Sequence, residues 1–228
     1  AQNASDGLWL LASPWSPPAF MKDSGNMLFG GKLLPEYYGV WADYFVKYIQ
    51  SYQNCGIKIN GVTVQNESMA TQTWESCVYS SDEQLDFVKN HLYPAFKKAG
   101  LDTKIMIWDH NKERVYDWTR DLKNDSDAYG CVSGVAFHWY SGSHFDALRY
   151  ATQTAPDKTF ICSEFCYGGP DVNDWQAAEG YAYDISGNFN SGMNGSIDWN
   201  IILDENGGPY HARGGGCRAV VHYNTVTD

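Results

Sequence analysis

The stretch GVTVQNE at residues 61–67 decides how the rest of the chain is interpreted. Its first half is short, apolar and β-branched, which is the composition of a buried strand, and it ends abruptly in an amide and a carboxylate. It therefore predicts a buried strand that delivers Glu67 to one end of a sheet. A second carboxylate, Glu164, follows the apolar run 159–163 and is the candidate partner at the same end.

Apolar runs with the character of strands alternate with helical patterns along the whole chain. The predicted strands cover residues 8–12, 57–66, 104–108, 134–139, 159–163 and 195–202, and the predicted helices cover residues 35–52, 81–99, 115–122, 144–152 and 174–188. Ser80 or Ser81 is the predicted N-cap of the second helix, and Asp174 is predicted to lie near the N-cap of the last. The alternation predicts βα units and a parallel α/β sheet.

Composition excludes several classes of partner. The 228 residues carry a net charge of −11, without a basic run, which disfavours a nucleic acid or an anionic membrane. No apolar stretch approaches the roughly 20 residues of a membrane span, and no signal peptide opens the chain. The glycosylation sequons at Asn3, Asn124 and Asn194 favour a secreted or extracellular protein, and the six cysteines lack the spacing of a zinc ribbon.

Each predicted strand is followed by polar or aromatic residues at its carboxyl end. In a parallel sheet these ends share one edge, where active sites are built. One polar residue after a strand is ordinary capping, but six strands in succession indicate a functional edge. The candidates are Trp15, Asn66, Glu67, Asp109, His138, Tyr140, Glu164, Trp199 and Asn200.

Two carboxylates that face each other among aromatic rings meet the requirements of glycoside hydrolysis. One protonates the leaving oxygen, and the other attacks or stabilises an oxocarbenium-like centre, so neither a cofactor nor a metal is needed. His110, His138 and His144 fall near the same edge and could bind a metal adventitiously, but no spacing indicates a catalytic metal.

The same segments resemble glycoside hydrolase family 30, which includes glucosylceramidase, β-glucosidases, β-xylosidases and β-1,6-glucanases. They are LASPWSPP at 11–18, VTVQNE at 62–67, WESC at 74–77, IWDHN at 107–111, FHWY at 137–140, SE at 163–164 and DWN at 198–200. The resemblance implies a (β/α)8 TIM barrel and a retaining β-glycosidase that acts on a β-linked glucan or glucoside.

In that resemblance Glu67 is the acid/base and Glu164 the nucleophile. Asn66 contacts the 2-hydroxyl of the sugar, and the same subsite is lined by His138 and Tyr140 and shaped by Trp15 and Trp199. Asp109 is expected to contact and position these residues. The charge of Glu164 is expected to raise the pKa of Glu67 and keep it protonated.

The resemblance begins at what would be the third barrel strand. We therefore expect a single truncated barrel domain over residues 1–228, without a companion β-sandwich, because six strands cannot close an eight-strand barrel. Loops or a second copy of the chain, as a homodimer, would cover the open side. Two residues depart from the family pattern: Asn60 stands where relatives often have Trp, and Ser68 where they usually have Pro.

The missing strands leave two alternatives to an active enzyme. One is a non-catalytic carbohydrate-binding remnant, and the other is a fragment whose absent strands come from a separate polypeptide. The enzyme hypothesis makes a demand on the backbone, because strict alternation would send Asn66 and Glu67 to opposite faces of the sheet. Both can address one sugar only if the strand bends or bulges at its end.

Overall fold

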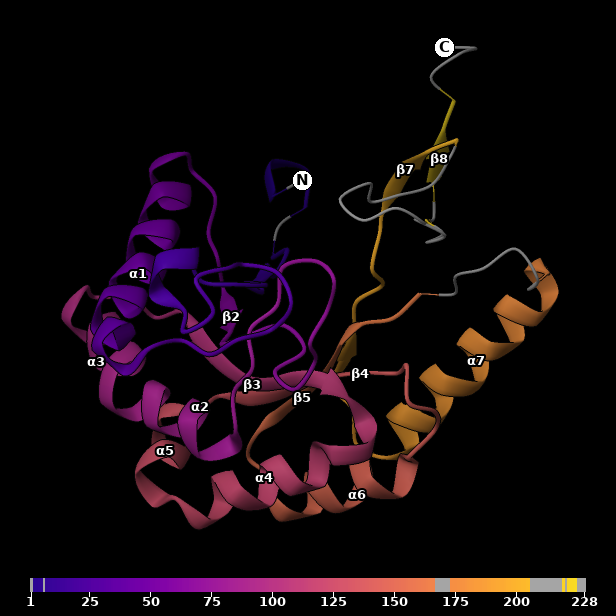
Figure 1. Cartoon of the computed structure of the whole chain (residues 1–228). Coiled ribbons are helices and arrows are strands. Elements are labelled where there is room, and N and C mark those ends of the chain that lie inside the picture. Colours follow the sequence, from indigo (N-terminus) through magenta and orange to yellow (C-terminus); the bar gives the residue numbers. More distant parts are fainter. Residues whose placement is uncertain (1, 6, 167–172, 206–218, 220, 225–228) are drawn as a thin grey trace.

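Six parallel strands form the central sheet. The computed structural model describes residues 2–5, 7–166, 173–205, 219 and 221–224. The strands lie side by side in chain order: β1 (Leu11–Ala12), β2 (Gly61–Thr63), β3 (Lys104–Asn111), β4 (Gly134–His138), β5 (Thr159–Glu164) and β6 (Gly195–Ser196). The sheet curls into an incomplete barrel with β1 and β6 at its edges (Figure 1), which confirms the predicted class.

Helices follow the strands as the periodicity predicted. They are α1 (Tyr38–Asn54), α2 (Ser81–Phe87), a π-helical turn (Val88–Leu92), α3 (Tyr93–Lys98), α4 (Val115–Asn124), α5 (Ser126–Cys131), α6 (Phe145–Thr154) and α7 (Asp174–Asn190). Short 3₁₀ turns cover Gln2–Ala4, Ala19–Met21, Pro35–Tyr37 and Lys112–Arg114. Figure 1 shows α4 and α6 side by side below the sheet, with α7 at the β6 side.

Side-chain caps fix where two of these helices begin. Ser80, rather than Ser81, caps α2: its hydroxyl accepts from the backbone of Glu83, whose carboxylate accepts from the Ser80 backbone at 2.7 Å. The N-cap of α7 is Asn173, whose side chain accepts from Gln176 N at 2.9 Å, and Asp174 is the first helical residue, near the cap as predicted.

The last predicted strand is the main error in the sequence-based assignment. Instead of one strand over 195–202, β6 ends at Ser196 and a separate strand, β7 (Ile202–Asp204), pairs in parallel with β8 (Val221–Tyr223). Beyond β6, the backbone N–H of Ile197 still donates to Cys162 O at 2.8 Å, and that of Trp199 donates to Phe165 O at 3.0 Å and to the Asp198 carboxylate at 2.8 Å. The strands predicted over 8–12 and 57–66 are also shorter than expected.

The core lies between the sheet and its helices. Every residue of β4 is buried, as expected for a parallel strand covered on both faces. The stripe of α1 that packs against the sheet includes Trp41, Phe45 and Ile49. Burial of each such side chain stabilises the fold by roughly 1.5–3 kcal/mol.

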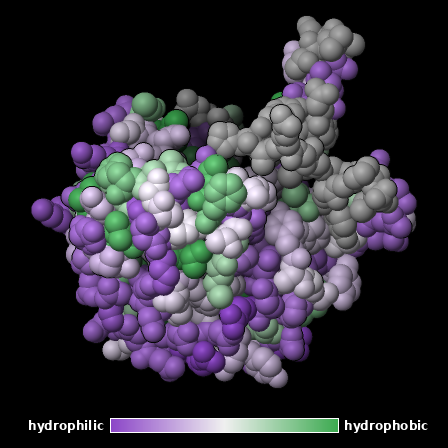
Figure 2. All heavy atoms as spheres, viewed as in Figure 1, coloured by the Kyte–Doolittle hydropathy of each residue, from purple (hydrophilic) through white to green (hydrophobic). Residues whose placement is uncertain are grey.

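The surface is unevenly apolar. Figure 2 shows hydrophobic side chains gathered over the loops beside α1, whereas the face over α4 to α6 is mostly hydrophilic. Phe20 and Phe29, in the segment between β1 and α1, are exposed. None of the described helices is both long and apolar enough to cross a membrane. Cys55, Cys77, Cys131 and Cys162 are free thiols, and Cys217 lies outside the described residues.

A buried ion pair ties the 3₁₀ turn after β3 to the last helix. Lys112 is fully buried and donates to the carboxylate of Asp184 on α7 and, at 3.0 Å, to Asn188. Its ammonium also lies 4.8 Å from the ring centroid of Phe145 on α6. Three elements therefore meet at one desolvated charge.

We expect Lys112→Ala to lower the free energy of unfolding by about 3–5 kcal/mol, because it leaves the carboxylate of Asp184 buried and unpaired. Urea unfolding measures the change. The matched control is Lys58→Ala, which removes an ion pair whose side chains are 54% and 73% exposed and should cost less than about 1 kcal/mol. Equal losses in the two variants would contradict the prediction.

Candidate active site

The carboxyl edge of the sheet collects the candidate residues. Glu67 follows β2, Asp109 lies near the end of β3, His138 ends β4 and Glu164 ends β5. The structure links these residues through hydrogen bonds and close charge contacts, as their positions at the strand ends predicted. Tyr140 lies two residues beyond β4 and joins the group through Glu164.

Asp109 is the centre of the group. Its buried carboxylate accepts hydrogen bonds from Ser163 Oγ at 2.5 Å and Thr63 Oγ1 at 2.6 Å, and its Oδ1 lies 3.1 Å from His138 Nε2. Burial alone would raise the pKa of this carboxyl, but His138 and the two hydroxyls lower it below its ordinary value. Asp109 is therefore a stable anion that connects four neighbouring strands.

Two register shifts turn these residues toward each other. Trp108 pairs with Ala136 and His110 with Phe137, so Asp109 is an extra residue in β3. Ser163 is likewise the extra residue in β5, and it donates to Asp109. These irregularities re-aim side chains that regular alternation would place differently.

The backbone at the end of β2 also bends, as the enzyme hypothesis requires. Glu67 has a φ of +49°, in the left-handed region that side chains rarely adopt. Its backbone N–H donates to Asp109 O at 2.7 Å, while that of Asn66 donates to Pro14 O at 2.9 Å. The bend ends the alternation between Asn66 and Glu67, and Asn66 is buried at 6% exposure.

Glu67 lies among two imidazoles and an amide. Its Oε1 is 3.5 Å from His138 Nδ1 and 3.8 Å from His110 Nδ1, and its Oε2 accepts from Gln72 Nε2 at 2.9 Å. Burial would raise the pKa of Glu67, but His138, Gln72 and His110 lower it below the ordinary value. The prediction that Glu164 keeps Glu67 protonated is therefore wrong, because the nearby imidazoles outweigh the carboxylate.

Glu164 carries the opposite shift. Burial, reinforced by the charges of Glu67 and Asp109, raises its pKa to about 7, although His138 and the hydrogen bond from Tyr140 at 3.0 Å oppose the rise. His138 has a pKa raised to about 10, because Asp109 and Glu67 together overcome its desolvation. In the free chain, His138 is therefore protonated up to about pH 10, and Glu164 is protonated below about pH 7.

Two tryptophans join the ends of the incomplete barrel. Trp15, from the loop after β1, stacks on Trp199, from the loop after β6, with ring centroids 5.3 Å apart and planes inclined by 16°. The rings thus bridge the two edges of the sheet above the carboxyl rim. Beside them, the Nδ2 of Asn200 is buried without a hydrogen-bond partner among the described residues.

Sequence reasoning missed three polar residues of this site. Thr63 and Ser163 hold Asp109, and Gln72 holds Glu67. Thr63 and Ser163 stand inside the segments of the family resemblance, whereas Gln72 lies in a loop without any periodic signal. The residue at the family's usual proline position, Ser68, is fully buried, and its hydroxyl donates to Trp108 O at 2.9 Å.

Three side chains of types that bind metals lie close together at the same edge. Among the described residues, Glu67, His110 and His138 each place one donor atom within 4.8 Å of the others.

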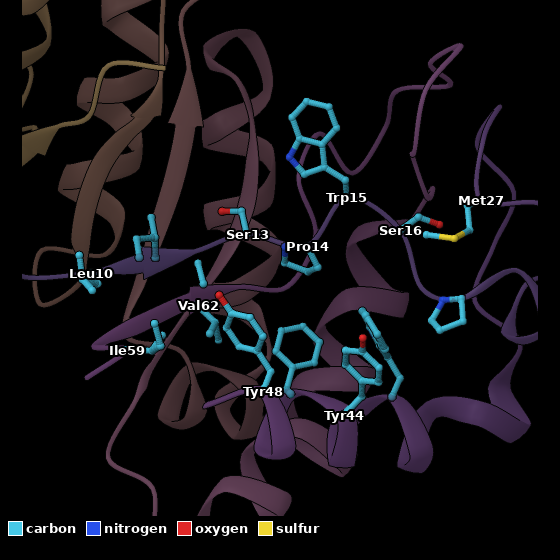
Figure 3. Close-up of a pocket in the computed structure, with 15 residues that line it drawn as sticks. Leu10, Ser13, Pro14, Trp15, Ser16, Met27, Tyr44, Tyr48, Ile59 and Val62 are labelled. Carbon is cyan, nitrogen blue, oxygen red and sulfur yellow. The ribbon is translucent and has the colours of Figure 1, made fainter. Parts of the chain in front are cut away.

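A separate apolar cavity of about 620 Å³ lies beside the edge strand β1. Figure 3 shows Tyr44 and Tyr48 of α1 on one side of it, below Val62 and Leu10. Trp15 also lines this cavity, whereas Glu67 and Glu164 do not. The hollow is therefore a feature of the β1 edge rather than of the carboxylate pair.

We expect Asp109→Asn to lower the pKa of His138 from about 10 by about 1–3 units, because the imidazolium loses its closest anion. A ¹H–¹⁵N NMR titration of the imidazole measures this change. Asp102→Asn removes an exposed acid that is paired with Lys58, and it serves as the control that leaves His138 unaltered. An unchanged His138 in Asp109→Asn would contradict the assigned contact.

We expect Glu164→Gln to stabilise the fold at alkaline pH. Because folding raises the pKa of Glu164 from 4.5 to about 7, ionisation of this group lowers stability progressively across that interval, and full stability is present only below it. The neutral amide avoids this loss, which reaches about 3 kcal/mol above pH 7. Urea unfolding at pH 4.5 and pH 8 should show a gain at pH 8 alone; a gain of equal size at both values would contradict the assignment.

Comparisons with known proteins agree with the fold described above. The family model of the glycosyl hydrolase family 30 TIM-barrel domain matches residues 1–227. A putative glucosylceramidase 3 of Caenorhabditis elegans is 35% identical over 91% of this chain, and an endo-1,6-β-D-glucanase of Neurospora crassa is 32% identical over 90% of it. The solved structure of SrfJ from Salmonella typhimurium is 40% identical, with a TM-score of 0.94 over 98% of this chain.

The matched region is only part of each relative. The chain spans 43% of the nematode protein, 42% of the fungal one and 51% of the SrfJ chain. Its correspondence to the third barrel strand onward stays a prediction. The match of the family model over residues 1–227 of this chain, together with the curled parallel sheet, shows that this chain belongs to glycosyl hydrolase family 30.

Proposed function

We propose that this chain carries the catalytic residues of a retaining β-glycosidase that hydrolyses β-glucosidic or related β-linked bonds. The observation that carries the proposal is the pair Glu67 and Glu164, which lie at the carboxyl ends of two strands of one parallel sheet and interact through His138. Two of the relatives named above are a putative glucosylceramidase and an endo-1,6-β-D-glucanase, and family membership adds the reaction class.

The proposed reaction has two displacement steps. Glu164 attacks the anomeric carbon and forms a glycosyl ester, while the glycosidic C–O bond breaks and Glu67 donates its proton to the leaving oxygen. Glu67 then takes a proton from water, the resulting hydroxide attacks the anomeric carbon, and the ester bond to Glu164 breaks. Neither step needs a cofactor, and direct attack requires carboxyl groups about 5 Å apart.

The surrounding residues have proposed roles in binding. Asn66 contacts the 2-hydroxyl of the sugar, and Tyr140 orients the nucleophile through its hydrogen bond to Glu164. Because Trp15 and Trp199 stack on each other, they offer the sugar the edge or outer face of the pair rather than a slot between the rings. Asn200 has an unpartnered amide nitrogen for a sugar hydroxyl.

The charge state of the free chain favours a second candidate, a sugar-binding remnant or a fragment that needs further strands. The proposed reaction starts with Glu67 protonated and Glu164 ionised, whereas the shifts of their pKa values run the other way. The partial span of the relatives agrees with this candidate. The single barrel domain, the homodimer and the extracellular location stay predictions.

We expect turnover of an aryl β-glucoside by the parent chain to fall at least about 100-fold in Glu67→Gln and in Glu164→Gln, because each loses a group that bonds to or protonates the substrate. Azide should restore activity to Glu67→Ala and yield the β-azide, whereas Glu164→Ala should yield the α-azide.

Asp102→Asn is the control for this experiment, since it replaces an exposed acid just before β3, at the opposite end of the strand from the pair, with the corresponding amide. A parent chain that binds sugar but is as inactive as the variants would overturn the enzyme proposal and support the second candidate. Native mass analysis of that inactive parent identifies any additional chain it requires.

A further inference from the structure

Three side chains from three strand ends converge on one small space. Glu67 follows β2, His110 lies in β3 and His138 ends β4, and their donor atoms lie within 4.8 Å of one another. His138 is fully buried, while Glu67 and His110 are each 12% exposed. The space is thus nearly closed but retains access from the rim.

Two ring nitrogens in this space have no hydrogen-bond partner among the described residues. They are Nδ1 of His110 and Nδ1 of His138, and both face Oε1 of Glu67 at 3.8 and 3.5 Å. A buried polar atom without a partner is destabilising, so most such atoms in proteins are satisfied by a ligand, an ion or water. Here two of them face the same oxygen.

Outer contacts hold the donors in the orientation that a metal requires. Nε2 of His138 lies 3.1 Å from Asp109 Oδ1, which directs Nδ1 toward Glu67. Gln72 donates to Glu67 Oε2 at 2.9 Å and leaves Oε1 facing the two imidazoles. A carboxylate behind a histidine is the usual second contact of a zinc-bound imidazole.

We propose that Glu67, His110 and His138 form a binding site for a Zn²⁺-type cation, with Oε1 and the two Nδ1 atoms as ligands and the fourth position open to the rim. Ligands of tetrahedral zinc lie about 3.3 Å apart. The distances from Glu67 Oε1 to the two Nδ1 atoms are 3.5 and 3.8 Å, and the three donor atoms all lie within 4.8 Å of one another. Two imidazoles and one carboxylate select Zn²⁺ or Cu²⁺ over the oxygen-preferring Mg²⁺ and Ca²⁺.

The occupied site has a consequence for the proposed reaction. Coordination takes the carboxylate that the reaction needs as its acid/base, so the cation acts as an inhibitor. The binding itself rests only on the positions of three side chains in the described structure. An inactive chain that binds zinc therefore refutes the proposed function and leaves the site intact.

Isothermal titration of the tag-free chain with ZnCl₂ at pH 8 tests the proposal. One Zn²⁺ per chain is expected, with affinity reduced at least about tenfold in His110→Asn and in Glu67→Gln, each of which removes one ligand. His144→Asn is the matched control: this exposed histidine contacts Ser141 O rather than the cluster, and its replacement should leave the affinity within about twofold. Far-ultraviolet circular dichroism establishes that each variant is folded.

Cobalt provides a test without substitution. Co²⁺ bound to the parent chain should give the intense visible absorption of a four-coordinate ion and be displaced by one equivalent of Zn²⁺. Unchanged zinc affinity in a folded His110→Asn, equal loss in His144→Asn, or only the weak absorption of hydrated Co²⁺ would each overturn the site.

Discussion

The buried carboxylate of Asp109 is the interaction on which the carboxyl edge of this sheet depends. It lies on β3 and contacts Thr63 of β2, His138 of β4 and Ser163 of β5. A desolvated anion is tolerable only when hydrogen bonds and a nearby cation compensate it. The requirement to satisfy Asp109 therefore fixes the relative positions of four strands and of the side chains at their ends.

The position of His138 follows from that anion and determines the charges around it. With one nitrogen against Asp109 and the other facing Glu67, its imidazole holds a proton to about pH 10 and keeps Glu67 anionic. Glu164 then stands near two anions in a buried setting and becomes the weaker acid. Which of the two proposed catalytic carboxyls has the higher pKa thus depends on the whole group of charges, not on either residue alone.

The two edge strands of the incomplete sheet are connected through the loops that follow them. β1 and β6 pair on one side only, yet the loops that follow them meet in the stacked pair Trp15 and Trp199. Aromatic stacking of this kind contributes about 0.5–1.5 kcal/mol beyond the area it buries. The contact joins the edges at the rim, while the apolar cavity beside β1 leaves the side of the sheet open.

The sequence by itself determined the class of fold and the placement of Glu67 and Glu164 at the carboxyl ends of strands, because these follow from periodicity and from residues placed directly after buried strands. It could not place Asp109 and Ser163 as extra residues of shifted strands, or Gln72 against Glu67, since register and loop contacts depend on partners distant in the chain. The pKa values were decided by tertiary structure alone. Burial and the facing of His138 toward two carboxylates reversed the order expected from a simple carboxylate pair, because electrostatic energy depends on distances that no linear pattern records.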